Sequence, residues 1–384
     1  MMPYTPQTEN PPYEKEATSA IADVRDGAAV DRLVDIDLAR GLAVLGMCVV
    51  HVGGNFPDVA LVRDLMELAY GRSSALFAVL AGFSIILITG RETPKSGEAG
   101  GQAVARVAIR ALVLLAIGSI LTCLGTNVAV ILEPYGICFL LVLPLYRLSA
   151  QQLGLLAAGT ALVLPQVCFL LQLFGPVEYL DPVFDFMVRG TYPAMTWVSF
   201  VIAGMAIARL SLNTQAMHWR LGLAGGALAV LGYGGSWLAL RLLHGVPADP
   251  DWWREATSDP WVLLVAAPHS EKTFSILGNT GCALIVIAAC WLAMNALPHL
   301  RKLVWPIIAV GSMPLTAYVL HIVGIAYLNH AMGIDLVLED GSLSMLFGFV
   351  VVISTFAVLW LRVFQRGPME VLMGRIADLA RHIR

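Results

Sequence analysis

The polar residues best suited to chemistry lie in one apolar segment near the N-terminus. Residues 32–55 read RLVDIDLARGLAVLGMCVVHVGGN, with Asp37 and Arg40 early in the segment and His51 and Asn55 late. In an α-helix, the step from Arg40 to His51 amounts to about 20° of net rotation and about 16 Å of rise, so both side chains lie on one face. The spacing therefore predicts a helix with a charged pair at one end of a face and a histidine at the other.

His51 is the first candidate for catalysis. Histidine can act as a general base near neutral pH or accept an acyl group. Asn55, one turn further on, could orient His51 or donate a hydrogen bond to an oxyanion. A polar stripe along a membrane helix is costly unless it faces other helices, a partner charge or water, which favours a helix that lines a site. The alternative is an ion pair between Asp37 and Arg40 at the lipid head groups, with His51 as a structural residue.

Three further ionisable residues could take part in catalysis. Arg72 begins the next apolar segment, at the end expected to lie near His51. Glu133 lies inside an apolar segment beside Pro134, and His269, just ahead of another segment, is a rival base to His51. An ionisable residue inside the membrane is a functional hypothesis by default, although a structural ion pair would also explain Glu133.

Three long connections on the same side as His51 are the expected place for substrate binding. They cover 54–71, 175–192 and 244–272, and long loops on one side of a helix bundle suit a polar substrate. Interfacial tryptophans and packing at a proline-interrupted helix are the alternative explanations. The candidates are polar or aromatic residues in these connections or in the helices that adjoin them: Asp185, Arg189, Tyr192, Trp197, Asn279, Tyr318 and His321.

The composition indicates a polytopic membrane protein. Of 384 residues, 58% are hydrophobic and 13% are charged, which is too apolar for an ordinary soluble protein. No nucleotide-hydrolase, zinc-protease or serine-hydrolase motif occurs in a suitable context, and neither a metal nor a nucleic-acid partner is expected. We expect an all-α bundle of about ten transmembrane helices, at 35–53, 72–90, 104–124, 127–146, 152–174, 193–210, 219–243, 273–297, 303–328 and 343–365.

The distribution of positive charge predicts the orientation of the chain. With the N-terminus inside, 18 of the 24 Lys and Arg residues fall on the cytoplasmic side, so both termini should be cytoplasmic. His51 then lies at the extracytoplasmic end, and Arg40, Arg106 and Arg110 at the cytoplasmic end. Residues 1–31 are expected to form a disordered acidic tail, 32–365 the transmembrane domain, and 366–384 an amphipathic tail helix on the inner leaflet.

Two parts of the chain resemble known families. The N-terminal part resembles the core of the transmembrane acyltransferases related to heparan-α-glucosaminide N-acetyltransferase, through Arg32, Asp37-x-x-Arg40-Gly41, Gly46, His51, GRSSALF at 71–77 and Ala81-Gly82. The C-terminal third resembles the YeiB-type bacterial membrane proteins grouped with them, through PHS at 268–270, LGNTG at 277–281, GSMPLTAY at 311–318 and RGPME at 366–370.

The resemblance implies a reaction and its partners. An acetyl or other acyl group would move from cytoplasmic acyl-CoA to a hydroxyl or amino group on an extracytoplasmic, sugar-containing acceptor, either a glycan or a glycolipid. The family's histidine matches His51, as general base or acyl carrier. The CoA nucleotide would bind near Arg40, Arg106 and Arg110, with Asp37 helping to organise that end, and its pantetheine arm would span the ~16 Å to His51.

The same resemblance places the protein in the lipid bilayer of the bacterial plasma (inner) membrane. A homodimer would also be compatible with the sequence. Acetyl-CoA or another acyl-CoA is then the co-substrate. The alternative, from a different functional class, is a transporter or exporter of a small polar or glycolipid molecule, in which the buried polar residues form a permeation path.

Overall fold

The computed structural model describes residues 34–52, 60–174, 182–212, 214–243, 252–254, 258–297, 299–333 and 342–382, together with Gly245 and Ala256. Every regular element in these ranges is helical, which confirms the expected all-α class. Besides an N-terminal helix at 34–52, the longer helices are α2 (Ala60–Ala69), α3 (Arg72–Thr89), α4 (Gly97–Thr122), α5 (Leu132–Val142), α6 (Ala150–Phe174), α8 (Ala194–Ala208), α9 (Gln215–Ala229), α10 (Gly235–Leu243), α11 (Thr273–Ala296), α13 (Trp305–Ser312), α14 (Pro314–Met332), α15 (Leu343–Val363) and α16 (Pro368–Ala377).

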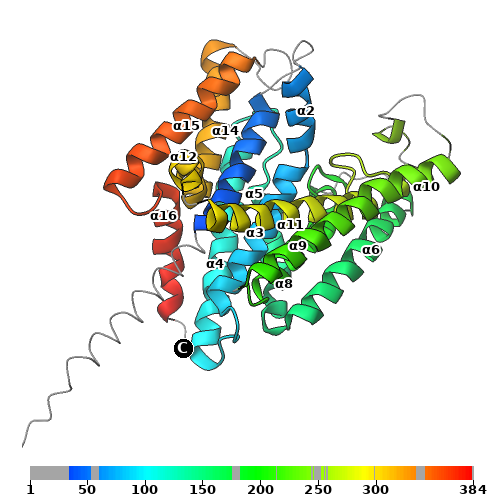
Figure 1. Ribbon diagram of the computed structural model, residues 1–384, viewed down its shortest axis with the longest axis horizontal. Coiled ribbons are helices and arrows are strands. Elements are labelled where there is room, and N and C mark those ends of the chain that lie inside the picture. The colour runs from blue at the N-terminus through cyan, green and yellow to red at the C-terminus, as the bar shows by residue number, and fades with distance from the viewer. Residues whose placement is uncertain are drawn as a thin grey trace, which may run out of the picture.

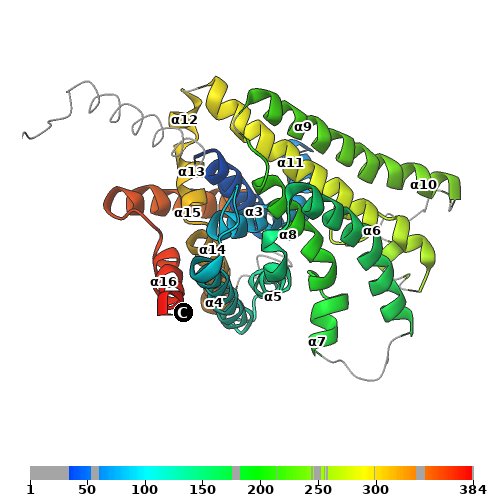
Figure 2. The ribbon, with the colours of Figure 1, turned by 90° about the horizontal axis from the view of Figure 1, so that it is seen from below.

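The helices form two groups with the N-terminal helix and α3 between them (Figure 1). On one side α11 runs along α9, and α6 packs on α8, which in turn packs on α3 (Figure 2). On the other side α14, α15 and α16 lie close to α13 and α4. The C-terminal third of the chain is therefore packed against the first helices rather than forming a separate unit.

The lengths of the helices fit a multi-pass membrane protein. Among the described residues, seven helices are long and apolar enough to cross a membrane, and α8 is a shorter apolar helix. The ninth expected segment is broken into α13 and α14 at Met313-Pro314, because proline cannot continue a helix through its own nitrogen. The number of ten crossings and the orientation of the termini remain predictions.

Small residues let the central helices approach closely. A Cβ on Gly311 of α13 would overlap the main-chain oxygen of Asp37, and a Cβ on Gly41 would overlap that of Ile307. Because each helix places its glycine against the other's backbone, the N-terminal helix and α13 cross at contact distance. This crossing holds the helix that carries Arg40 and His51 against the C-terminal third of the chain.

The C-terminal motif RGPME closes the break between α13 and α14. Glu370, in the first turn of α16, accepts hydrogen bonds from the main-chain nitrogens of Leu315 (2.8 Å) and Thr316 (3.1 Å) and from the Thr316 hydroxyl (2.5 Å). The first turn of a helix has unsatisfied N–H groups and a positive dipole end, so a carboxylate is stabilising there. The tail helix, described as far as His382, therefore anchors α14; the predicted tail at 1–31 lies outside the described residues.

Candidate active site

Two histidines from opposite ends of the chain meet in one hydrogen bond. His51, near the end of the N-terminal helix, and His321 of α14 lie with Nδ1 of His51 3.1 Å from Nε2 of His321, and their rings stack at 5.3 Å. His321 is completely buried and His51 is half-buried. His51 is thus the member of the pair that a substrate can approach.

The direction of the hydrogen bond between the two histidines depends on their tautomers. Nδ1 of His321 is buried without a hydrogen-bond partner among the described residues, while the main-chain carbonyls of Ala317 and Tyr318 act on this ring from its own helix. When Nε2 of His321 is the acceptor, Nδ1–H of His51 donates to it, and the lone pair on Nε2 of His51 is left for chemistry. Tyr318 packs edge-on against His321 at 4.8 Å and is held by the N–H of Ile131, which donates to its hydroxyl at 3.1 Å.

The opposite end of the same helix carries the predicted charged pair. Arg40 donates to Asp37 at 2.9 Å and to the Ser84 hydroxyl of α3 at 2.8 Å. The two side chains are each 18% exposed, so this is a partly buried pair whose geometry is set by two helices. The guanidinium is therefore fixed in position at the end that we call the Arg40 end, about three turns of helix from His51.

Additional arginines gather at the Arg40 end. Arg106 and Arg110 lie on successive turns of α4, and Arg110 is within electrostatic range of Arg40, Arg106 and Arg366. Asp378 approaches Arg106 at 4.0 Å. The Nε atoms of Arg106 and Arg110 are buried without a hydrogen-bond partner among the described residues. Four arginines and two carboxylates leave an excess of positive charge with unused donors, which suits a phosphate-bearing ligand.

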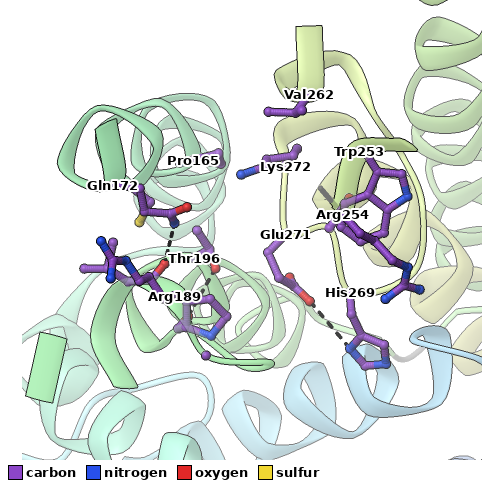
Figure 3. Close-up of a pocket in the computed structure, with 15 residues that line it drawn as sticks. Pro165, Gln172, Arg189, Thr196, Trp253, Arg254, Val262, His269, Glu271 and Lys272 are labelled. Carbon is purple, nitrogen blue, oxygen red and sulfur yellow. Dashed lines mark hydrogen bonds and ion pairs between the residues drawn. The ribbon is translucent and has the colours of Figure 1, made fainter. Parts of the chain in front are cut away.

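A cavity of about 150 Å³ lies at the other end of the bundle, among α6, α8 and the connection that leads into α11. Figure 3 shows the side chains of His269 and Glu271 directed at one another in its lining, with Lys272 on the α6 side and Arg254 beside Trp253. Nδ1 of His269 and Oε1 of Glu271 are 3.9 Å apart, too far for a hydrogen bond. Both side chains therefore keep polar capacity for a ligand.

The backbone is strained at His269 and Glu271, which we call the dyad. His269 and Glu271 both have positive φ, at 57° and 55°, a region that residues other than Gly, Asn, Asp and His seldom occupy, so Glu271 is the more unusual of the two. Ser270 between them is buried, and its N–H and hydroxyl donate to the carbonyls of Ala267 and Val265. Such strain persists only where the surrounding contacts enforce it, and it is concentrated at functional sites.

Burial controls the charge of the dyad. Burial raises the pKa of Glu271 from 4.5 to about 8, so this carboxyl is mostly protonated at neutral pH. Burial, reinforced by the positive charge of Arg254, lowers the pKa of His269 from 6.5 to about 4, so the imidazole is neutral there. At pH 7 the dyad is thus a neutral acid beside a neutral base.

Replacing Glu271 with glutamine is expected to change how stability depends on pH. Between pH 4.5 and 8 the unfolded protein loses the Glu271 proton while the folded protein keeps it, so the wild type loses stability from this group as pH rises. Glutamine has no proton to release in this range, so the variant lacks this loss of stability. The melting temperature of Glu271→Gln minus that of wild type should therefore increase from pH 5 to about pH 8 and level off above it, in thermal unfolding of the purified protein. A constant difference across this range would contradict the buried neutral carboxyl.

Aromatic residues connect the cavity to the histidine pair. Tyr192 packs edge-on against both His269 (5.4 Å) and Trp197 (4.8 Å), and Tyr70 at the end of α2 packs edge-on against His269 (5.1 Å). His269 is also within electrostatic range of His51. The cavity and the histidine pair therefore lie at the same end of the bundle, which we call the His51 end.

The remaining predicted residues fall into smaller groups. Arg72 donates to the Tyr233 hydroxyl at 3.0 Å, and that hydroxyl donates to Asn279 at 2.7 Å, so two candidates form one network through a residue that the sequence did not single out. Glu133 accepts a long hydrogen bond from Thr122 at 3.4 Å.

Of the candidates in the outer connections, Arg189 lines the cavity and lies 4.0 Å from Asp185. Asn55 lies outside the described residues. Within the described part of the chain, no group of three or more His, Cys, Asp or Glu is arranged to hold a metal ion.

Three residues emerge only from the structure. Glu271 and Lys272 complete the cavity, and Arg366 joins the arginines at the Arg40 end. A sequence signal existed for the first two, because HSEK at 269–272 places three ionisable residues directly before an apolar segment. Arg366 stands in the RGPME motif, but its neighbours in space come from residues more than 250 positions earlier.

Comparison with known families divides the chain in two. Residues 32–245, more than half of the chain, match the catalytic family of heparan-alpha-glucosaminide N-acetyltransferase. Residues 252–379 match a family of proteins of unknown function (DUF418). Among curated proteins, none matches the chain significantly. The site residues come from both matched regions, since His51, Arg40, Arg106 and Arg110 lie in the first, and His269, His321 and Arg366 in the second.

Proposed function

Because the chain belongs to the heparan-alpha-glucosaminide N-acetyltransferase catalytic family, a family of membrane acyltransferases, we propose that it transfers an acyl group from acyl-CoA, with acetyl-CoA as the first candidate, to an acceptor across the membrane. The observation that carries the proposal is the N-terminal helix itself. It presents Arg40 within a cluster of arginines at one end and His51 in a histidine pair at the other.

The arginine cluster supports a donor site for the CoA nucleotide. Phosphates are bound well by arginine because the guanidinium offers several donors in one plane. The unpartnered Nε atoms of Arg106 and Arg110 are donors of the required kind. With this end in the cytoplasm, as the excess of Lys and Arg on that side favours, the pantetheine arm would extend about 16 Å along the N-terminal helix and bring the thioester to His51.

The histidine pair supports the transfer step. His51 Nε2 takes the proton from the hydroxyl or amino group of the acceptor as that atom attacks the thioester carbon. The carbon–sulfur bond breaks, the sulfur leaves as the CoA thiolate, and the proton passes from the imidazolium to the thiolate. His321 stabilises the imidazolium through the hydrogen bond at Nδ1 of His51. The residue that orients the base in a catalytic triad has the same role. In the variant route His51 itself carries the acyl group before the acceptor attacks.

Thermal unfolding with increasing acetyl-CoA tests the donor half of the proposal. A ligand that binds only the folded protein raises its stability by mass action, by about 2.7 kcal/mol at a ligand concentration of 100 Kd. We expect a saturable rise in melting temperature with acetyl-CoA, accompanied by CoA release when an acceptor is supplied. A flat response to acetyl-CoA and to longer acyl-CoAs would overturn the proposal in favour of a transporter.

A further inference from the structure

Buried polar atoms around the cavity at the His51 end have no partner within the protein. Nδ1 of His269, Oε2 of Glu271 and Nε1 of Trp253 are buried without hydrogen-bond partners among the described residues, and all three side chains line the cavity (Figure 3). Glu271 is only 5% exposed. Because an unpaired buried polar atom is costly, these atoms call for a polar group inside the cavity.

The spacing of the dyad fits one oxygen atom. Nδ1 of His269 and Oε1 of Glu271 are 3.9 Å apart, and an oxygen at a hydrogen-bonding distance of about 2.8 Å from each fits between them. Both side chains are neutral at pH 7. Whichever tautomer His269 adopts, the neutral carboxyl can supply the opposite role, so the bridging atom accepts one hydrogen bond and donates the other.

A hydroxyl group meets this requirement. It both donates and accepts, whereas an ammonium group only donates and an ionised phosphate oxygen only accepts. Nε1 of Trp253 is a donor and requires an oxygen of its own, as does the ammonium of Lys272 on the α6 side. The lining therefore suits a group that carries several hydroxyls.

The arginines of the lining do not alter this requirement. Arg189 and Arg254 are exposed, and Arg189 lies 4.0 Å from Asp185. Because solvent reaches both guanidinium groups, neither requires an anion from the cavity. Their exposure also shows that the cavity reaches the surface of the protein, where a polar molecule can enter it.

The dyad lies beside the proposed catalytic residues but outside the region that matches the acyltransferase family. That match covers residues 32–245, and the dyad falls within 252–379, which match the family of unknown function. His269 is nevertheless within electrostatic range of His51. A molecule held at the dyad is therefore at the same end of the bundle as the histidine pair.

We propose that the cavity binds an uncharged polyhydroxylated group, with one hydroxyl bridging His269 and Glu271 and a second oxygen accepting a hydrogen bond from Trp253. That this molecule is the acyl acceptor rests on the proposed function, whereas its binding does not. His269 and Glu271 are then positioning residues that select acceptors with a hydroxyl at this place. A site built to hydrogen-bond a hydroxyl rejects an analogue that lacks it, because its own buried groups are left unpaired.

Binding of simple polyhydroxylated rings to the full-length protein tests the proposal. The probes are the methyl glycosides of glucose, galactose, mannose and N-acetylglucosamine, in a polyoxyethylene detergent that carries no sugar, and the readout is saturation-transfer difference NMR. We expect saturable binding of at least one of them and none of tetrahydropyran, the same ring without hydroxyls. Failure of all four glycosides would leave the cavity to ordered water and overturn the proposal, as would an equal response to tetrahydropyran.

Variants place the bound probe. Glu271→Leu should weaken binding by about tenfold or more, whereas Glu271→Gln, which keeps one donor and one acceptor, should bind within about threefold of wild type. Trp253→Phe keeps the ring but loses the donor, and it should also weaken binding. Glu92→Leu, in the exposed connection between α3 and α4, is the control and should change nothing.

Two results with these variants would overturn the site. The first is binding as in wild type by both Glu271→Leu and Trp253→Phe, and the second is a loss in Glu271→Gln as large as in Glu271→Leu. Melting temperatures of all four variants report whether each one folds. If Glu271→Leu does not fold, the comparison of Trp253→Phe and Glu271→Gln with wild type still decides the outcome.

Acetyl-CoA titrations on the same preparations separate this proposal from the proposed function. With the bound glycoside as acceptor, Glu271→Leu should raise the KM for the glycoside by about tenfold or more and leave the KM for acetyl-CoA unchanged. A saturable response to acetyl-CoA without glycoside binding contradicts only the polyol site. Glycoside binding without a response to any acyl-CoA contradicts only the donor half of the proposed function.

Discussion

Replacement of His51 by glutamine is expected to lower the rate of acyl transfer by about 10²–10⁴-fold, the usual contribution of a general base. Glutamine keeps a polar side chain that can still contact His321, so the packing of the N-terminal helix is largely preserved. The measurement is release of CoA from acetyl-CoA with acceptor present, with the melting temperature and acetyl-CoA affinity as controls for folding. Transfer at the wild-type rate in His51→Gln would contradict the proposed mechanism.

His321 provides the matched comparison, because it acts through His51 and does not face the substrate. The hydrogen bond between the two rings is worth most when His51 is charged, and a bond to a charged group contributes about 1.5–3 kcal/mol. His321→Gln should therefore reduce kcat by roughly 10–150-fold. It should leave the KM for acetyl-CoA unchanged and alter the pH dependence of kcat. A loss confined to stability, with kcat and its pH profile intact, would make His321 merely structural.

Acylation of the enzyme in the absence of acceptor distinguishes the two roles of His51. If His51 carries the acyl group, incubation with labelled acetyl-CoA should leave label on the wild type that hydroxylamine removes, and none on His51→Gln. If His51 is only a base, neither protein should be labelled, although the loss of transfer in the variant is the same.

Replacement of Arg110 by glutamine is expected to weaken acetyl-CoA binding by at least about tenfold, because a charge-assisted hydrogen bond to a phosphate is lost. The side chain has an unpartnered buried Nε and lies within electrostatic range of three other arginines. Removal of one charge from such a cluster relieves repulsion, so the fold should tolerate it. The check is the concentration of acetyl-CoA that gives half of the maximal rise in melting temperature, at low and at high salt.

Two controls make the Arg110 result specific. Arg362→Gln removes the same charge from an exposed position in the last turn of α15 and should leave acetyl-CoA binding unchanged. Acetyl-pantetheine, which lacks the nucleotide and its phosphates, should be a poor donor that wild type and Arg110→Gln use equally well. A defect of Arg110→Gln that persists with acetyl-pantetheine would show that the residue does not act on the phosphates.

The helical class and the polar face of the first helix could be predicted from local patterns. The apolar composition leaves few alternatives to helices in a membrane, because every main-chain polar group must be satisfied within its own segment. The face shared by Arg40 and His51 follows from the helical repeat. The break at Met313-Pro314 was also visible, because proline removes a main-chain donor wherever it stands.

The partners of these residues could not be read from local patterns. From the sequence, His321 and Tyr318 are substrate-binding candidates. His321 follows His51 by 270 positions along the chain, yet the fold brings the two within hydrogen-bonding distance. The sequence HSEK marks Glu271 only as one of three ionisable residues before an apolar segment. Only its burial beside His269 distinguishes it.

By itself the sequence determined that this is a helical membrane protein whose first helix joins a charged pair to a histidine. Tertiary structure decided what those residues meet: His51 meets His321, the α4 arginines meet Arg366, and His269 meets Glu271. The physical reason is that the helical repeat acts over a few residues, whereas these contacts depend on which helices cross. The crossings are set by glycine contacts such as Gly41 with α13, and by the carboxylate of Glu370 at the start of α14.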